Sequence, residues 1–245
     1  MTNSLYDISV SSLAIALSLV IPVLLILYFW GLRAGKATYA LARMLVQLVL
    51  VGYVLSFLFG STNSLLILAV LTSMVLISSW IALGSIEAKR SQLYGVVLIA
   101  ILLGGGGTLW VITQWVLVLD PWYAPHYLIP LAGMIFANAM NCVSLAAERM
   151  NTELNRGETY WVARSQALQA AMIPIINSLF AVGLVSLPGM MTGQILSGVS
   201  PLIAARYQIL VMCMIFSSAG LSAAIYLVLA KPNRLADLLS FARKP

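Results

Sequence analysis

Long apolar runs separated by short polar segments are the dominant pattern along this chain. A helix needs about 20 apolar residues to cross a hydrocarbon core of about 30 Å. Seven runs are close to that length or exceed it, at residues 10–30, 38–59, 65–83, 92–119, 128–156, 174–199 and 201–230. The pattern therefore predicts an all-α membrane protein with seven transmembrane helices, in a single transmembrane domain over residues 1–245.

Composition and charge strengthen this interpretation and add an orientation. Of the 245 residues, 62% are hydrophobic and 8% are charged, which excludes a soluble domain. The net charge of +6 does not indicate nucleic-acid binding, because the basic residues form short clusters between the apolar runs. These clusters lie at the ends of the first, third, fifth and seventh runs or after them, and contain Arg33, Lys36, Lys89, Arg90, Arg149, Arg156, Arg164, Lys231, Arg234, Arg243 and Lys244. The positive-inside rule then predicts an outside N-terminus and a cytoplasmic C-terminus, in a multi-pass protein of the inner (plasma) membrane.

The sixth apolar run cannot form one straight helix, because Pro188 and Gly189 interrupt it. Pro174 favours the first turn of a helix, and a helix over residues 174–186 would be only about 20 Å long. We therefore expect a helix that is broken at residues 186–189, partway across the membrane. Unpaired backbone at that depth is tolerated only beside protein or water, so such a break often marks a transport site. The alternative is a helix that ends near the outer surface and continues as a buried loop.

Polar residues in and around this segment are the candidates for a transport pathway. Arg206 follows a strong helix start at Ser200 and Pro201, on the side where arginine is otherwise absent, so we expect it to bind backbone carbonyls or a substrate. Interfacial anchoring is the alternative for Arg206, and close helix packing is the alternative for the asparagines. The complete candidate set is Ser186, Pro188, Gly189, Thr192, Gln194, Arg206, Asn138, Asn141 and Gln47.

A second candidate site lies where the fifth run ends. Residues 128–156 would form a helix of about 44 Å, which is longer than the hydrocarbon core and would project into the cytoplasm. Gly157 is a plausible helix stop, and a short amphipathic helix follows it. We expect a cytoplasmic helical hairpin at residues 148–172 that contacts a soluble partner through Asn155, Arg156, Gly157, Glu158, Thr159 and Tyr160. The alternative is a helix that lies on lipid headgroups.

The sequence contains no recognisable catalytic or nucleotide-binding motif. There is no Gly-x-x-x-x-Gly-Lys-Ser/Thr loop, and no His/Asp pair or carboxylate cluster accompanies a nucleophile. We therefore expect a transporter subunit rather than an enzyme, with no cofactor of its own and with any ATP hydrolysis on a separate chain. The eleven methionines and two cysteines would suit Cu(I), but they are also ordinary apolar residues of membrane helices, so the metal ligands stay unassigned.

Four long patterns, in order along the chain, resemble the FetB-type permeases. They are residues 43–55, residues 129–140, the motif Gly183-Leu-Val-Ser-Leu-Pro-Gly-Met-Met-Thr-Gly193 and residues 200–208. These permeases are membrane subunits of an ABC-type iron exporter and are related to plant aluminium-tolerance proteins. The resemblance implies a homodimeric permease with two copies of a separate cytoplasmic ATPase, metal-ion export, and resistance to metal or oxidative stress.

One departure from the family's pattern leaves the substrate open. The resemblance implies an aspartate and a lysine, three residues apart, just before the motif, but this chain has Asn177 and Phe180 there. A chelated or organic substrate is therefore an alternative to a metal ion. A stand-alone secondary carrier is a further alternative, although the carboxylates of this chain fall at or beyond the predicted cytoplasmic edge, where they would not couple an ion gradient.

Overall fold

The computed structural model describes residues 9–61, 63–86 and 90–231. All regular elements in these ranges are helices, and the one β-type pairing is an isolated bridge between Val182 and Ser186. The chain forms two compact units, residues 1–62 and residues 63–245, which are described separately here. The all-α prediction is confirmed, whereas the prediction of a single domain stays a prediction.

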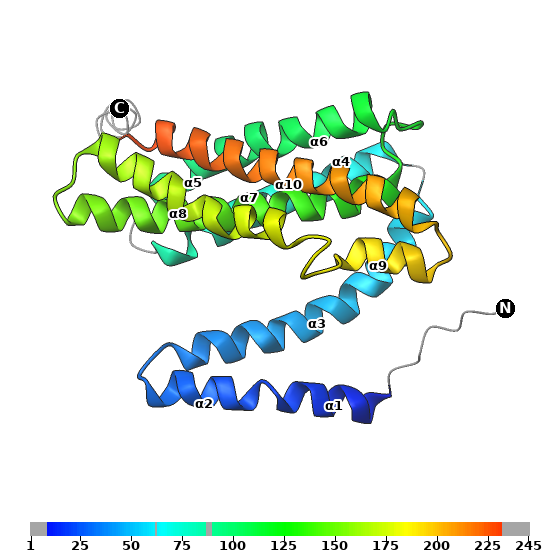
Figure 1. Cartoon of the computed structure of the whole chain (residues 1–245), viewed down its shortest axis with the longest axis horizontal. Helices are drawn as coiled ribbons and strands as arrows, with labels where there is room; N and C mark the ends of the chain where they lie inside the picture. Colours follow the sequence, from blue (N-terminus) through cyan, green and yellow to red (C-terminus); the bar gives the residue numbers. More distant parts are fainter. Residues whose placement is uncertain (1–8, 62, 87–89, 232–245) are drawn as a thin grey trace. The chain divides into compact units, whose positions relative to one another are not determined.

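The first unit contains α1 (Val10–Ser18), α2 (Ile21–Phe29) and α3 (Ala34–Phe59) (Figure 1). The predicted span over residues 10–30 corresponds to one candidate span, Val10–Phe29, which the structure divides into two helical pieces. Pro22 has no backbone N–H for the carbonyl of Ser18, so the helix is interrupted between α1 and α2. The two pieces together are still long and apolar enough to cross a membrane.

The second unit is built around α7 (Pro125–Asn155), which packs against three other long helices. These are α4 (Ser64–Ala82), α8 (Tyr160–Ala181) and α10 (Pro201–Leu229), and Figure 1 shows them running side by side. Buried apolar side chains such as Ile135, Val143 and Met214 fill the space between them. Short elements complete this unit, namely η1 (Leu83–Ser85), α5 (Arg90–Ile101), the π-helix η3 (Leu102–Gly106), α6 (Gly107–Val111), the π-helix η4 (Ile112–Val116) and α9 (Gly189–Leu196).

The packing of η3 against α10 is unusually close. A side-chain carbon added at Gly104 would lie 2.5 Å from the backbone nitrogen and the hydroxyl oxygen of Ser222. Only glycine allows this approach, since any Cβ would overlap the neighbouring backbone. The four-glycine run at residues 104–107 thus includes one position with a definite packing role.

Six helical stretches of the described chain are long and apolar enough to span a membrane, including Val10–Phe29, Arg90–Val116 and the whole of α7. α8 is not among the six, although its 22 residues would span about 33 Å. The reason is its polar first half, which contains Arg164, Gln166 and Gln169. The described chain therefore contains six candidate spans where seven had been predicted.

The structure corrects the predicted geometry of the sixth run. Pro174 lies inside α8 and does not begin a helix, so residues 160–181 form one continuous helix. Membrane helices tolerate an internal proline because neighbouring helices and hydroxyl side chains compensate the freed backbone groups. The break covers residues 182–188, which is earlier than the predicted 186–189. The second arm of the predicted hairpin at 148–172 is consequently the start of α8 and not a separate helix.

Candidate functional site

The break between α8 and α9 begins as a tight turn around one carbonyl group. The carbonyl of Ala181 accepts from the backbone N–H groups of Leu184, Val185 and Ser186, at 3.2, 2.8 and 3.2 Å. Gly183 has a φ of +81° there, a conformation that residues with a Cβ rarely adopt. This local turn ends α8 at Ala181.

Several backbone carbonyls in the break have no backbone partner. No described N–H group donates to the carbonyls of residues 182–185 or of residue 187. The side chains of Leu184 and Val185 are also 89% and 86% exposed. If the segment lies within the membrane, these carbonyls require water or protein beside them.

The chain becomes helical again at Pro188. The carbonyl of Pro188 accepts from the backbone N–H of Thr192 at 3.0 Å and from its hydroxyl at 3.1 Å. The hydroxyl of Thr192 is therefore already bonded to the backbone of α9. Gln194 lies further along α9, and its side-chain oxygen is buried with no partner among the described residues.

A cavity of about 300 Å³ lies between α7, α8, the break, α9 and α10. Four of the sequence-predicted pathway residues line it together: Asn138, Ser186, Pro188 and Gly189. Asn138 donates from its side-chain nitrogen to the carbonyl of Met134 at 2.8 Å. The structure therefore brings the α7 asparagine and the broken segment to one place.

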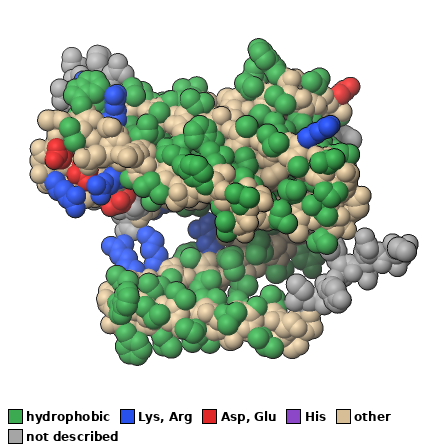
Figure 2. All heavy atoms as spheres, in the orientation of Figure 1, with side chains coloured by type: hydrophobic (Ala, Val, Ile, Leu, Met, Phe, Trp, Pro, Cys, Tyr) green, Lys and Arg blue, Asp and Glu red, His purple; other side chains and the backbone are tan. Residues whose placement is uncertain are grey.

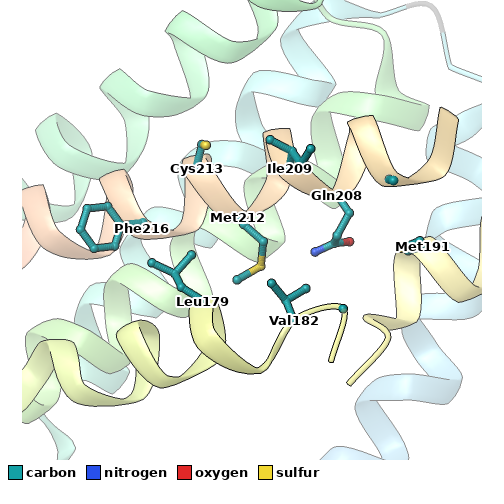
Figure 3. Close-up of a pocket in the computed structure, with 10 residues that line it drawn as sticks. Leu179, Val182, Met191, Gln208, Ile209, Met212, Cys213 and Phe216 are labelled. Carbon is teal, nitrogen blue, oxygen red and sulfur yellow. The ribbon is translucent and has the colours of Figure 1, made fainter. Parts of the chain in front are cut away.

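A larger cavity of about 450 Å³ lies between α8, α9 and α10 (Figure 3). It shares Val182, Gln208 and Met212 with the smaller cavity. In Figure 3 the Gln208 and Met212 side chains extend from α10 toward α8, while Cys213 points away from them. The rest of the lining is mostly apolar and includes Leu179, Ile209 and Phe216.

Gln208 is the residue at this site that the sequence analysis missed. It is only 6% exposed, and its side-chain oxygen is buried with no hydrogen-bond partner among the described residues. The signal available in the sequence was a single amide inside the apolar run of residues 201–230. That signal did not reveal which helices cover the amide.

The other predicted pathway residues lie away from these two cavities. Asn141 is exposed on α7, and Gln47 is exposed on α3 in the first unit. Arg206 is exposed on α10 and makes no hydrogen bond with a described residue, so no bond to the carbonyls of the break is observed. A role of these side chains toward a substrate stays a prediction.

The turn between α7 and α8 is exposed and well anchored. Gly157 has a φ of +90°, which favours glycine, and residues 155–159 are all exposed. Before the turn, Glu153 is 3% exposed and pairs with Arg149 at 2.8 Å and Arg156 at 3.1 Å. After it, the hydroxyl of Tyr160 donates to the carbonyl of Leu227 on α10 at 2.9 Å.

Charged side chains gather at this end of the second unit, while hydrophobic side chains cover most of its visible face (Figure 2). Arg164 lies 4.6 Å from the ring centre of Trp161, and Lys231 lies 5.7 Å from it. Such basic and aromatic side chains are typical of the boundary between membrane and water. The turn with Asn155, Arg156, Gly157, Glu158, Thr159 and Tyr160 is thus held in a fixed position at a polar end of the helices.

Comparison with known proteins gives the family. Residues 10–234 match the model of the family described as "Uncharacterised protein family (UPF0014)". The chain is 34% identical to "UPF0014 membrane protein slr1647" of Synechocystis over 91% of this chain and 92% of that protein. It is 35% identical to the "Probable iron export permease protein FetB" of Escherichia coli K12, over 90% of each chain.

A plant protein and the solved structures complete the comparison. The chain is 31% identical to the "Protein ALUMINUM SENSITIVE 3" of Arabidopsis thaliana, over 90% of this chain and 85% of that protein. No solved structure matches the chain. The match covers nearly the whole sequence, and six helical stretches of the described chain are long and apolar enough to span a membrane, so the chain belongs to the UPF0014 family of membrane permeases.

Proposed function

We propose that this chain is the membrane-spanning subunit of an ABC transporter that exports metal ions, with iron as the first candidate. The observation that carries the proposal is the broken helix: residues 182–188 leave carbonyls unpaired beside two cavities between packed helices. Interrupted helices next to a cavity are how transporters expose backbone and side-chain polar groups to a cargo. The relative named as an iron export permease supplies the candidate substrate.

ATP hydrolysis would take place on a separate cytoplasmic ATPase subunit. The turn at residues 155–160 supports such a partner, because residues 155–159 are exposed and the turn is fixed on both sides, by Glu153 and by the bond from Tyr160. A rigid turn transmits a movement of the soluble partner to the two long helices that it joins. A flexible turn would change its own conformation instead. In this arrangement residues Asn155, Arg156, Gly157, Glu158, Thr159 and Tyr160 contact the ATPase.

The proposed assembly is a homodimer of the permease with two ATPase copies in the inner (plasma) membrane. The positive-inside pattern would place the α7–α8 turn and the C-terminus in the cytoplasm and the N-terminus outside. The cargo would pass Ser186, Pro188, Gly189 and Asn138, which line one cavity together. Thr192, Gln194, Arg206, Asn141 and Gln47 would act elsewhere along the pathway.

Co-purification from native membranes tests this proposal. The tagged chain is expected to bring along an ATPase with a Gly-x-x-x-x-Gly-Lys-Ser/Thr loop, identified by mass spectrometry. Proteoliposomes with both chains should then move radioactive iron only when ATP is present. Gly157→Val is the matched variant: valine is strained at a φ of +90°, so it should lower ATP hydrolysis by the complex while the helices stay folded.

The competing function is a stand-alone secondary carrier. If an ion gradient drives iron transport in proteoliposomes that contain no ATPase chain, the protein is a secondary carrier and the ABC proposal is wrong. Full ATPase activity in Gly157→Val would separately remove the coupling role of the turn.

A chelated or organic substrate is the second candidate cargo, and one observation favours it. No carboxylate or histidine is among the residues that line the two cavities beside the break. Hydrated metal ions such as Mg²⁺ and Fe²⁺ bind best to carboxylate or imidazole ligands. Transport assays should therefore compare the bare metal ion with its complexes.

A further inference from the structure

The Gln208 amide is one of the few buried polar groups described in the second unit that lack a hydrogen-bond partner there. Its side chain is 6% exposed, its oxygen is buried without a partner, and neither half of the amide is hydrogen-bonded to a described residue. An amide that leaves water without gaining a hydrogen bond lowers the stability of the fold. Its position therefore calls for a partner that the folded chain does not itself provide.

Gln208 lies where the two cavities meet. It lines both of them, together with Val182 of the break and Met212 of α10. Figure 3 shows its amide extending from α10 toward Val182 and so toward the end of α8. A molecule in either cavity would therefore meet this amide beside the break.

The neighbouring polar groups are largely bonded already. The side-chain nitrogen of Asn138 donates to the carbonyl of Met134 at 2.8 Å, and the hydroxyl of Ser178 donates to the carbonyl of Pro174 at 2.9 Å. Ser186 adds one further hydroxyl to the smaller cavity. Among these groups, the amide of Gln208 and the hydroxyl of Ser186 are the two that make no hydrogen bond with a described residue, and of the two only the amide lines both cavities.

The remaining lining decides the class of molecule. It consists of aliphatic and aromatic side chains, the thiol of Cys213, and the thioethers of Met134, Met190, Met191 and Met212. Pockets of about 300–1,000 Å³ with mostly apolar walls and a few polar groups bind small organic molecules. The larger cavity, at about 450 Å³, is within that range.

The geometry points to a binding site for a small organic molecule that has an apolar body and an N–H or O–H group paired with the Gln208 side-chain oxygen. This inference rests on the proposed transport function and names its substrate class. If the cargo contains a metal, the metal is carried inside an organic complex whose outer surface makes these contacts. An amide-like group suits the site best, because it would also accept a hydrogen bond from the Gln208 nitrogen.

Two compounds of nearly the same shape test the hydrogen bond. N-methylbenzamide has an N–H group where methyl benzoate has an ester oxygen. Binding of both to the purified full chain in lipid nanodiscs, without any ATPase, is measured by calorimetry or saturation-transfer NMR. We expect N-methylbenzamide to bind about tenfold more tightly than methyl benzoate, the effect of one buried hydrogen bond.

Substitutions then assign the effect to Gln208. Gln208→Met keeps the length of the side chain and removes the amide, so it should weaken N-methylbenzamide binding to the level of methyl benzoate and leave the ester unaffected. Gln114→Met is the matched control, because Gln114 lines a separate cavity near α4 and α6. This control should bind both compounds as the unmodified chain does.

Three results would overturn the inference. The first is equal affinity of the two compounds for the unmodified chain, a comparison that needs no variant to fold. The second is an unchanged preference for N-methylbenzamide in Gln208→Met. The third is binding of a ferrous salt without any organic compound, if this binding is lost in Gln208→Met. The binding assay contains no ATPase, so a negative binding result would not argue against the proposed ABC transporter. In the same way, a failure to co-purify an ATPase would not argue against the binding site.

Discussion

Replacing Gly104 by alanine should destabilise the second unit through one defined contact. The added carbon would lie 2.5 Å from the backbone nitrogen of Ser222 and 2.8 Å from its Cα. Carbon atoms prefer separations of about 3.5–4.0 Å, so η3 or α10 must move by about 1 Å. Overpacking of this kind typically costs about 1–3 kcal/mol, and the higher helix propensity of alanine offsets up to about 1 kcal/mol of that.

The adjacent glycines form an internal control series. An added carbon at Gly107 would have no neighbour within 4 Å, and one at Gly106 would meet only Leu102 at 3.5 Å. Alanine at Gly107 should therefore raise the free energy of unfolding by about 0.5–1 kcal/mol. At Gly105 the nearest atoms are side-chain carbons of Ile135 and Phe136 at 3.2 Å, and we expect an intermediate result.

Unfolding of the purified variants by SDS titration, in one detergent and at one protein concentration, measures these differences. The expected gap between Gly104→Ala and Gly107→Ala is about 2 kcal/mol. If the two variants unfolded at the same SDS concentration, the close approach of η3 to Ser222 would be wrong.

Three further predictions follow from the ends of the helices. Glu153→Gln should lower the free energy of unfolding by roughly 1–2 kcal/mol, because the carboxylate is buried but both arginine partners are partly exposed; the loss should be smaller at high salt, and a salt-independent loss would exclude the ion pairs as its cause. Arg206→Ala should change the free energy of unfolding by less than about 0.5 kcal/mol, since the arginine is exposed and makes no hydrogen bond with a described residue; a larger loss would mean that it does bind the carbonyls of the break. In a background without Cys142 and Cys213, a cysteine at Ser61 should react with an impermeant thiol reagent added outside sealed cells and one at Thr159 should not; the reverse pattern would invert the proposed topology.

The helices were predictable because their signals are local. Apolar runs and the Ser200-Pro201 start placed α10 within one residue of its observed ends, and Gly157 correctly marked the end of α7. Proline was ambiguous, because it both begins helices and is tolerated inside membrane helices. Pro174 was therefore assigned to the wrong role, and the break was predicted a few residues too late.

The site was only partly predictable because burial depends on packing between distant helices. The sequence alone predicts a helix break at Ser186, Pro188 and Gly189. In the structure these residues line a cavity together with Asn138. Gln208 becomes visible as an unpaired amide only when α8 and the break cover it. The ion pairs of Glu153 are predictable from the sequence, because its spacing from Arg149 and Arg156 places all three residues on one face of a helix.

The position of Pro174 gives α8 a mechanical property. The proline removes the N–H that would bond the carbonyl of Ala170, and the helical hydrogen bonds end at Ala181. Residues 175–181 thus form a helical segment about 10 Å long, with a backbone hydrogen bond missing at its start and the end of the helix at its other side. A tilt of this segment would disturb few hydrogen bonds. The segment includes Ile175, Ser178 and Leu179, which line the two cavities. A tilt at Pro174 would therefore change the shape of both cavities while the first half of α8 keeps its packing against α7.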